Sequence, residues 1–212
     1  GAASIEVNID VPKYVAAIAD ELVTKGHEAY VVGGAVRDSL IGRTPTDWDI
    51  ASSATPEQVK EIFSDKAVPT GERFGTLTVL SGNQAVEVTT FRREGRYSDG
   101  RRPDEVRFSK SLRDDMSRRD FTINALAYDI HQGTVTDYFG GINDLEDKII
   151  RAVGDPSQRF SEDSLRMLRA IRFAVELGFN ISPETLSGIV KHHSAIVRVS
   201  PERIQDELSK ML

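Results

Sequence analysis

The stretch VVGGAVRDSLIGRTPTDWDIAS, residues 31–52, predicts a buried strand, a glycine turn, a short helix and a second strand. The second strand carries Asp47 and Asp49, and alternate residues of a strand face the same side. Two carboxylates on one face repel each other unless a cation lies between them. This pattern indicates a mixed α/β fold, and it raises the hypothesis that the two aspartates hold a metal ion.

The composition is typical of a folded globular chain. The 212 residues, 39% of them hydrophobic, are enough for one large domain or for a domain with a smaller addition. No apolar run is long enough to span a bilayer and no leader pattern opens the chain, so neither a membrane partner nor secretion is expected. The absence of cysteine excludes disulfides and thiolate metal sites, and favours a reducing, cytoplasmic setting.

The charge of the chain is unevenly distributed. The net charge of −6 taken alone argues against a nucleic-acid partner, yet residues 92–119 contain nine arginines and one lysine against six acidic residues. The planar guanidinium of arginine suits phosphate groups, so this segment is a candidate for phosphate or RNA contact. The alternative is a basic surface that contacts only solvent.

Hydrophobic spacing and cap residues divide the chain into two parts, and neither contains an internal repeat. In the first part the pattern predicts a capped helix, a hairpin and a mainly helical segment, at 55–63, 75–91 and 111–130. In the second part it predicts only helices, at 160–179, 182–197 and 200–212. We therefore predict a mixed α/β domain over 1–153, with a mainly antiparallel sheet flanked by helices, and an all-helical domain over 154–212.

Two further features of the first part suit a phosphate and a metal ion. Gly33 and Gly34 lie between a strand and a helix, where glycine lets the backbone approach a phosphate closely. Glu87 lies between two valines of the hairpin, and it would join Asp47 and Asp49 if the strands were neighbours. Two metal ions held there could activate an attacking hydroxyl and stabilise a leaving pyrophosphate. The simpler alternative places Glu87 on a solvent-facing side of the hairpin.

Four stretches of sequence, in this order, resemble successive motifs of one enzyme family. They are VVGGAVRDSLIGRTPTDWDIASSATPEQV (31–59), RRDFTINALAYD (118–129), DYFGGINDLEDKIIRAVGDP (137–156) and RFSEDSLRMLRAIRFAVELGF (159–179). The family is that of the class II tRNA nucleotidyltransferases, which comprises CCA-adding enzymes and bacterial poly(A) polymerases within the superfamily of DNA polymerase β. The resemblance implies a catalytic head domain followed by a helical neck, and further body and tail domains beyond Leu212.

The resemblance also implies a role for individual residues. It implies that two magnesium ions are held by three catalytic carboxylates, those of Asp47, Asp49 and Glu87. It implies that the nucleotide is bound by a second set of residues: Gly33, Gly34, Arg37, Arg119, Asp120, Asn124, Asp163, Arg166, Arg169 and Arg172. The implied reaction is an in-line attack of the 3′-hydroxyl of tRNA on the α-phosphate of CTP or ATP, which releases pyrophosphate. No protein partner is implied.

Asp163 and Arg166 are expected to read the base. They are three positions apart and would share a face of the helix predicted over 160–179. The alternative for Arg166, Arg169 and Arg172 is an exposed arginine stripe, with Leu165, Leu168, Ile171 and Val175 packing on the other side. Cytosine and adenine each present an amino donor beside a ring-nitrogen acceptor, which an Asp–Arg pair can match. Uracil and guanine present the opposite pattern, so the protein would serve as its own template.

Several alternatives remain within and outside this family. A bacterial poly(A) polymerase shares the motifs but adds only A, and a specialist would add only CC or only A. The segment 92–108 corresponds to a mobile loop that CC-adding members have shortened, and its full length here favours an enzyme able to add A. A non-catalytic RNA-binding module is disfavoured, because binding alone has no need of three clustered carboxylates.

Overall fold

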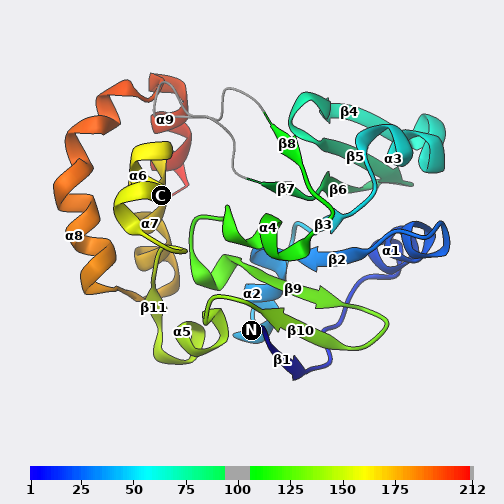
Figure 1. Cartoon of the computed structure of the whole chain (residues 1–212), viewed down its shortest axis with the longest axis horizontal. Coiled ribbons are helices and arrows are strands. Elements are labelled where there is room, and N and C mark those ends of the chain that lie inside the picture. Colours follow the sequence, from blue (N-terminus) through cyan, green and yellow to red (C-terminus); the bar gives the residue numbers. More distant parts are fainter. Residues whose placement is uncertain (94–105, 211–212) are drawn as a thin grey trace.

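A single mixed sheet organises the first part of the chain in the computed structural model, which describes residues 1–93 and 106–210 (Figure 1). Every pair of neighbouring strands is antiparallel except β3 and β6, which are parallel. The eight strands run from edge to edge in the order β1 (Ala3–Glu6), β10 (Thr134–Asp137), β9 (Leu126–Asp129), β2 (Ala29–Val32), β3 (Asp49–Ser52), β6 (Gln84–Thr90), β5 (Thr76–Ser81) and β4 (Ala67–Gly71). The predicted mixed, mainly antiparallel sheet is therefore confirmed.

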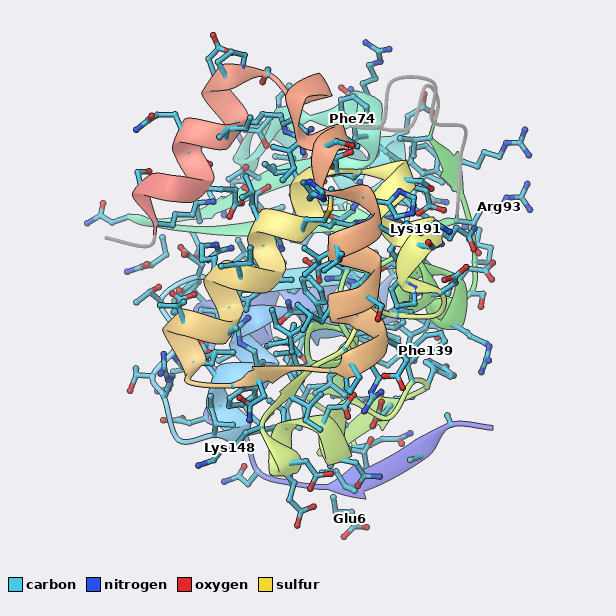
Figure 2. All side chains as sticks on the ribbon, turned by 90° about the vertical axis from the view of Figure 1, so that its left-hand side faces the viewer. Glu6, Phe74, Arg93, Phe139, Lys148 and Lys191 are labelled. Atoms are coloured by element: carbon cyan, nitrogen blue, oxygen red, sulfur yellow. The ribbon has the colours of Figure 1, made fainter. Side chains whose placement is uncertain are left out.

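Helices surround this sheet and make up most of the second part of the chain. The α-helices are α1 (Lys13–Thr24), α2 (Gly34–Leu40), α3 (Pro56–Phe63), α4 (Leu112–Ser117), α5 (Gly141–Asp147), α6 (Pro156–Glu162), α7 (Leu165–Leu177), α8 (Pro183–His192) and α9 (Pro201–Ser209). Short 3₁₀ turns are η1 (Ser64–Lys66), η2 (Glu72–Phe74), η3 (Thr122–Asn124) and η4 (His193–Arg198). Helices α6 to α9 gather beside one end of the sheet (Figure 1), and the view onto that side shows α7 and α8 in front of it (Figure 2).

The central strands are buried on both faces. Val31 and Ile50 point into a core that α1, α2 and α3 share with the sheet, whereas their neighbours Val32 and Ala51 point into a smaller cluster beneath α4. This alternation follows from the pleat, because successive side chains of a strand point to opposite faces. Burial on both faces makes the middle of the sheet a rigid platform for the residues at its end.

The local sequence signals at α3 and at the hairpin are confirmed. Thr55 caps α3 through its side chain, Gln58 completes the reciprocal capping box, and Pro56 occupies the first turn. Strands β5 and β6 pair in register up to the turn at Gly82-Asn83. These elements depend on neighbouring residues in the chain, so their sequence is sufficient to predict them.

The prediction of a mainly helical segment at 111–130 is wrong in its second half. Helix α4 ends at Ser117, and the chain then forms η3 and β9. Residues 125–127 are fully buried, because β9 lies between β10 and β2 with both faces covered. A strand covered on both faces has a continuous apolar run without alternation, and such a run does not distinguish a strand from a helix.

The single helix predicted over 160–179 is interrupted. Helix α6 ends at Glu162, Asp163 is extended, and α7 begins at Leu165. The Asp163 carboxylate accepts a hydrogen bond from the Leu165 backbone N–H at 3.1 Å, so this side chain competes with the helical pattern. Asp163 and Arg166 therefore do not lie on one helix, which corrects the predicted i, i+3 relation.

The alternative of an exposed arginine stripe on α7 is wrong, since Arg166 and Arg172 are buried. Ile171 and Val175 are exposed, whereas Met167, Ala170 and Phe173 are buried. The helical part contains one short strand as well, because β12 (Asn180–Ile181) returns to pair in parallel with β11 (Ile149–Ile150). Strands β7 (Arg92–Arg93) and β8 (Arg107–Phe108) flank residues 94–105, so most of the predicted mobile loop lies outside the described residues.

Candidate functional site

Two of the predicted carboxylates share one row of the sheet. Asp49 on β3 is in register with Glu87 on β6, and both side chains are partly buried. Asp47 lies two residues before Asp49, just ahead of β3, and is exposed. The buried Trp48 between them points to the opposite side. Strands β3 and β6 are therefore neighbours, as the predicted role of Glu87 requires.

The surroundings of Asp49 disfavour the charged form of its carboxyl group. Burial raises the pKa of Asp49 above its ordinary value, and the charges of Glu87 and Asp47 add to this effect, while Arg119 opposes it. A carboxylate with a raised pKa beside two other acids is stabilised by a cation. Within residues 1–93 and 106–210, however, no three acidic or histidine side chains converge as a ready-made metal cluster.

The donor set nevertheless fits magnesium in its usual environment. Mg²⁺ prefers hard oxygen ligands, and it commonly takes one or two protein carboxylates together with the phosphates of a substrate. Asp49 and Glu87, adjacent in one row of the sheet, supply such a pair, with Asp47 two residues away. Substrate oxygens would complete the coordination, so a three-carboxylate cluster is not required.

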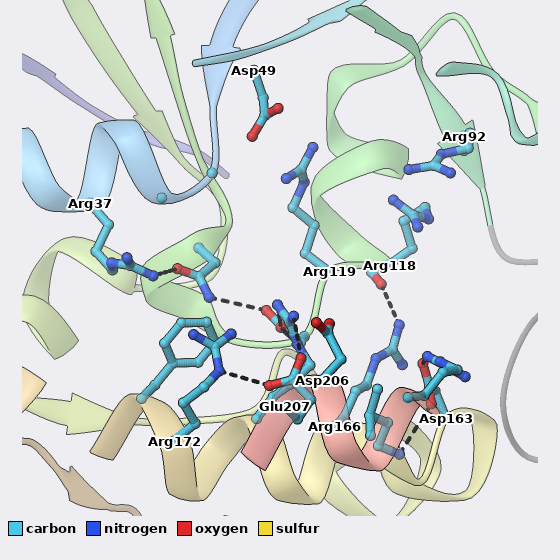
Figure 3. A pocket seen from close by; sticks show the side chains of 18 residues that line it. Arg37, Asp49, Arg92, Arg118, Arg119, Asp163, Arg166, Arg172, Asp206 and Glu207 are labelled. Carbon is cyan, nitrogen blue, oxygen red and sulfur yellow. Dashed lines mark hydrogen bonds and ion pairs between the residues drawn. The ribbon is translucent and has the colours of Figure 1, made fainter. Parts of the chain in front are cut away.

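The glycine turn lies next to the carboxylates. Gly33 has φ +75°, a backbone conformation that favours glycine, and it precedes α2. A Cβ atom at Gly33 would lie 3.6 Å from Arg119 Nη1 and 3.8 Å from Asp49 Oδ2. Figure 3 shows the Arg119 side chain extending toward Asp49. The turn, one cation and one carboxylate thus meet at the same end of the sheet.

A cleft of about 660 Å³ extends from this point to α7 and α9 (Figure 3). Eight arginines and five acidic side chains line it, so its lining is net positive. Among the lining residues are eleven of the thirteen predicted site residues: Gly33, Gly34, Arg37, Asp49, Arg119, Asp120, Asn124, Asp163, Arg166, Arg169 and Arg172. Asp47 and Glu87 lie outside this lining. An arginine-rich cleft that ends at carboxylates can hold a polyanion and a cation together.

Asp120 connects α7 with Asn124 and, through Asn124, with α2. Its carboxylate accepts two hydrogen bonds from Arg169 on α7, at 2.8 and 2.6 Å, and one from its neighbour Asn124 at 3.3 Å. Asn124 in turn accepts a hydrogen bond from Arg37 on α2 at 2.8 Å. Burial alone would raise the pKa of Asp120, but Arg169 outweighs it and the pKa is lowered. This chain of contacts fixes α7 against the sheet.

Replacing Arg169 by methionine is expected to destabilise the fold by about 2 kcal/mol. This is below the 3–5 kcal/mol typical of a fully buried pair, because the Arg169 side chain is 31% exposed. The lowered pKa of Asp120 means that its stabilisation is present above its ordinary pKa of 3.8 and is lost as the pH falls through the lowered value.

Urea unfolding at pH 7 and near pH 3 measures this effect, with the exposed Arg43→Met as control. The difference in the free energy of unfolding between the wild type and Arg169→Met should shrink at the lower pH, and the control should stay within about 0.5 kcal/mol of the wild type at both. A difference that is equal at the two pH values would contradict the assignment to Asp120.

The two residues predicted to read the base both face the cleft, but each has other partners. Arg166 donates to the Arg118 carbonyl oxygen at 3.0 Å and to Glu162 at 3.1 Å. Asp163 accepts a hydrogen bond from Arg203 on α9 at 3.2 Å. These contacts orient both side chains, although the two do not form the shared helical face that the sequence predicted.

Some residues that line the cleft or contact its lining were not predicted as site residues. Glu207 on α9 is 3% exposed and accepts a hydrogen bond from Arg172 at 2.7 Å. Asp115 on α4 is fully buried and accepts a hydrogen bond from Arg119 at 3.0 Å. Burial alone would raise the pKa of Asp115, but the charges of Arg119 and Arg118 outweigh it, so the pKa is lowered. Arg203 and Glu207 are four positions apart on α9 and therefore lie on one face of that helix. This spacing is the sequence signal that could have identified both residues.

The carboxylate row, the glycine turn and the positive cleft are the arrangement expected of a nucleotidyltransferase. The poly A polymerase head domain model matches residues 29–151, which is more than half of the chain, and residues 178–212 match the model of the probable RNA and SrmB-binding site of polymerase A. The chain belongs to the poly A polymerase head domain family. The family resemblance identified from the sequence motifs is therefore confirmed.

Several similar proteins are CCA-adding enzymes. The chain is 53% identical to that of Lactobacillus helveticus over 186 residues, which are 88% of this chain and 46% of that protein. The crystal structure of the Bacillus stearothermophilus CCA-adding enzyme in complex with CTP matches with a TM-score of 0.85 and 44% identity, covering 93% of this chain and 47% of that one. The Thermotoga maritima enzyme complexed with tRNA matches with a TM-score of 0.80 and 28% identity, covering 99% of this chain and 50% of that one.

The chain spans about half the length of the curated relatives it matches. In the part of the chain that the structure describes, no helix is long and apolar enough to cross a membrane.

Proposed function

We propose that the chain is the nucleotide-adding part of an enzyme that extends the 3′ end of tRNA with C and A, using CTP and ATP. The 3′-hydroxyl oxygen of the RNA attacks the α-phosphorus of the nucleotide, the bond to the β-phosphate oxygen breaks, and pyrophosphate leaves. The observation that carries this proposal is the arginine-lined cleft ending at Asp49, in a chain about half identical in sequence to CCA-adding enzymes over most of its length.

The triphosphate is placed at the carboxylate end of the cleft. Gly33 leaves room beside Asp49, and Arg119 reaches the same point. Asp115 fixes one end of the Arg119 guanidinium, so this arginine is preorganised rather than free to turn away. Arg37 contributes a second guanidinium, held by Asn124 and lying over the Phe173 ring. In this reaction class, positioning and charge stabilisation account for most of the rate.

Magnesium is proposed at Asp49 and Glu87, with Asp47 beside them. When bound, the ion supplies positive charge to the phosphate oxygens and to the attacking hydroxyl. The raised pKa of Asp49 supports this assignment, because a bound cation relieves the repulsion among the three acids. Asp49 and Glu87 would hold the ion from neighbouring strands, and Arg119 would keep the adjacent triphosphate oxygens in place.

The base is proposed to lie between Asp163 and Arg166. The carboxylate accepts from the exocyclic amine, and the guanidinium donates to a ring nitrogen or carbonyl. Hydrogen bonds to Glu162 and to the carbonyl oxygens of Arg118 and Arg159 hold Arg166 in place, and Arg203 holds Asp163. A fixed pair of this kind discriminates between bases because the wrong base leaves a buried polar group without a partner.

A second candidate function is poly(A) addition, favoured by the family model, which is described as a poly A polymerase head domain. Such an enzyme would add only A, to many RNAs. An enzyme restricted to CC or to A is a further variant. These functions share the cleft and differ in the nucleotides and RNA ends that they accept.

Nucleotide addition to three tRNAs, ending before the first C, after CC, and complete, distinguishes these functions. The 212-residue chain and a form extended to the length of its relatives would each receive CTP alone, ATP alone, and both. We expect the extended form to add C only to the first tRNA and A only to the second, and to leave the complete tRNA unchanged. Use of ATP but not CTP, with long A tails on any RNA, would instead establish a poly(A) polymerase.

A further inference from the structure

The face of the sheet that carries Glu87 also carries a group of threonines on neighbouring strands. Thr76 and Thr78 lie on β5, Thr89 lies on β6, and Thr70 lies on β4. Their hydroxyls form two separate contacts: Thr76 with Thr89 at 2.9 Å, and Thr70 with Thr78 at 2.8 Å. Only the second contact continues to an acidic side chain.

Thr78 donates a hydrogen bond to Glu87. Its Oγ1 lies 2.6 Å from Glu87 Oε1, and the two residues are in register between β5 and β6. Glu87 is at the same time in register with Asp49 on β3. Thr78, Glu87 and Asp49 therefore form one continuous row across three strands, on the same face of the sheet.

The direction of this hydrogen-bond chain follows from the chemistry of the groups. An ionised carboxylate only accepts, so the single hydroxyl hydrogen of Thr78 points to Glu87. Thr78 therefore accepts from its other neighbour, and Thr70 is the donor at 2.8 Å. In the order Thr70 to Thr78 to Glu87, the hydrogen bond takes Oε1 of Glu87, and Asp49 is the register neighbour of Glu87 on the other strand.

Within the described residues, the bond from Thr78 is the only hydrogen bond or ion pair of the Glu87 side chain. A glutamate has three side-chain torsions, so without a partner its carboxylate samples several directions. Groups behind a metal ligand that fix its orientation often change metal affinity by about 10- to 100-fold when removed. An ordinary cross-strand threonine–glutamate contact would affect only the stability of the fold.

We propose that Thr78 is a positioning residue for Glu87, supported by Thr70, and that it aims one carboxylate oxygen at a divalent cation shared with Asp49. This inference rests on the proposed function, because it assigns a cation to Asp49 and Glu87. It adds a residue outside the cleft lining to the machinery that binds the ion.

The test measures Mn²⁺ binding to the 212-residue protein in the presence of CTP, through the electron paramagnetic resonance signal of free Mn²⁺, with CTP alone as the blank. Thr78→Val keeps the shape of the side chain and removes the hydroxyl, and Thr78→Ser retains the donor. Thr76→Val is the matched control, since it removes a hydroxyl from the same strand and face that contacts Thr89 instead of a carboxylate. Urea unfolding of each variant separates affinity from stability, and Thr78→Ala provides a second variant that lacks the donor.

Thr78→Val and Thr78→Ala are expected to weaken Mn²⁺ binding about 10-fold. Thr78→Ser and Thr76→Val should remain within about 2-fold of the wild type, and the Mg²⁺ concentration for half-maximal nucleotide addition should move in parallel with Mn²⁺ affinity. In a Glu87→Gln background, Thr78→Val should have no further effect, because its target is already removed.

The outcomes test the role of Thr78 separately from the metal assignment. If Glu87→Gln weakens Mn²⁺ binding but Thr78→Val does not, the role of Thr78 is refuted and the metal assignment stands. If Glu87→Gln leaves binding unchanged, or the wild type with CTP binds no more Mn²⁺ than CTP alone, the metal assignment falls and the Thr78 inference falls with it. Equal weakening by Thr76→Val and Thr78→Val would also overturn the inference, since it would show a general effect of hydroxyl loss on this face.

Discussion

Replacing Asp47 or Asp49 by alanine is expected to lower the rate of nucleotide addition by at least about a thousand-fold while the protein stays folded. Removing a single charge-stabilising group from an active site often costs about 100- to 1,000-fold, and a lost metal ligand removes the charge of the ion as well. The measurement is primer extension with CTP and a tRNA lacking its 3′ end, together with circular dichroism of each variant.

The matched control is Asp65→Ala, which removes an exposed aspartate outside the cleft and should leave the rate unchanged.

Asp49→Asn tests the sign of the contribution that Asp49 makes to stability. Because the pKa of Asp49 is raised in the fold, the contribution of this group to stability is full below its ordinary pKa and is lost as the pH rises through the raised value. At pH 7 without metal, Asp49→Asn should therefore melt no lower than the wild type. A melting temperature that falls with the activity would attribute the loss to unfolding.

Replacing Arg166 by alanine is expected to relax the choice of base. A matched pair of hydrogen bonds to a base edge gives about 1–3 kcal/mol of discrimination, so the preference for CTP over UTP and for ATP over GTP should fall by about 5- to 150-fold. Asp163→Ala should act in the same direction. The measurement is kcat/KM for each of the four nucleotides.

Arg166→Lys is the informative companion variant. It keeps the positive charge but lacks the planar fork, so it should also lose base discrimination. Addition of CTP should decrease less in Arg166→Lys than in Arg166→Ala if charge at this point also serves the nucleotide. Discrimination against UTP and GTP that is unchanged in both Arg166 variants and in Asp163→Ala would refute base reading by this pair.

The parts of the fold that could be predicted are those that depend on neighbouring residues in the chain. The cap at Thr55, the turn at Gly82-Asn83 and the strand–helix–strand order around Gly33 all have local causes. Strand β9 was predicted as helix because burial on both faces removed the alternation that marks a strand. The break at Asp163 was missed because a short side-chain contact competes with a helical pattern that is otherwise continuous.

The candidate site shows the same difference between features with local causes and features that depend on the fold. Sequence motifs were sufficient to select residues that the structure then brings together in one cleft. They were not sufficient for the partners of those residues, such as Glu207 for Arg172 or Asp115 for Arg119. The pairing with Glu207 depends on how α9 docks against α7, and no local pattern encodes that contact.

The parallel pairing of β3 with β6 has a consequence for how the protein folds. Asp49 and Glu87 are 38 positions apart in the chain, and α3, β4 and β5 lie between their strands. Antiparallel neighbours such as β5 and β6 can zip from a tight turn, whereas a parallel pair must first close a long loop. Contacts of high sequence separation form slowly, so the two carboxylates should meet late in folding. Recovery of divalent-ion affinity during refolding would then report the completion of the sheet, after the β5–β6 hairpin has formed.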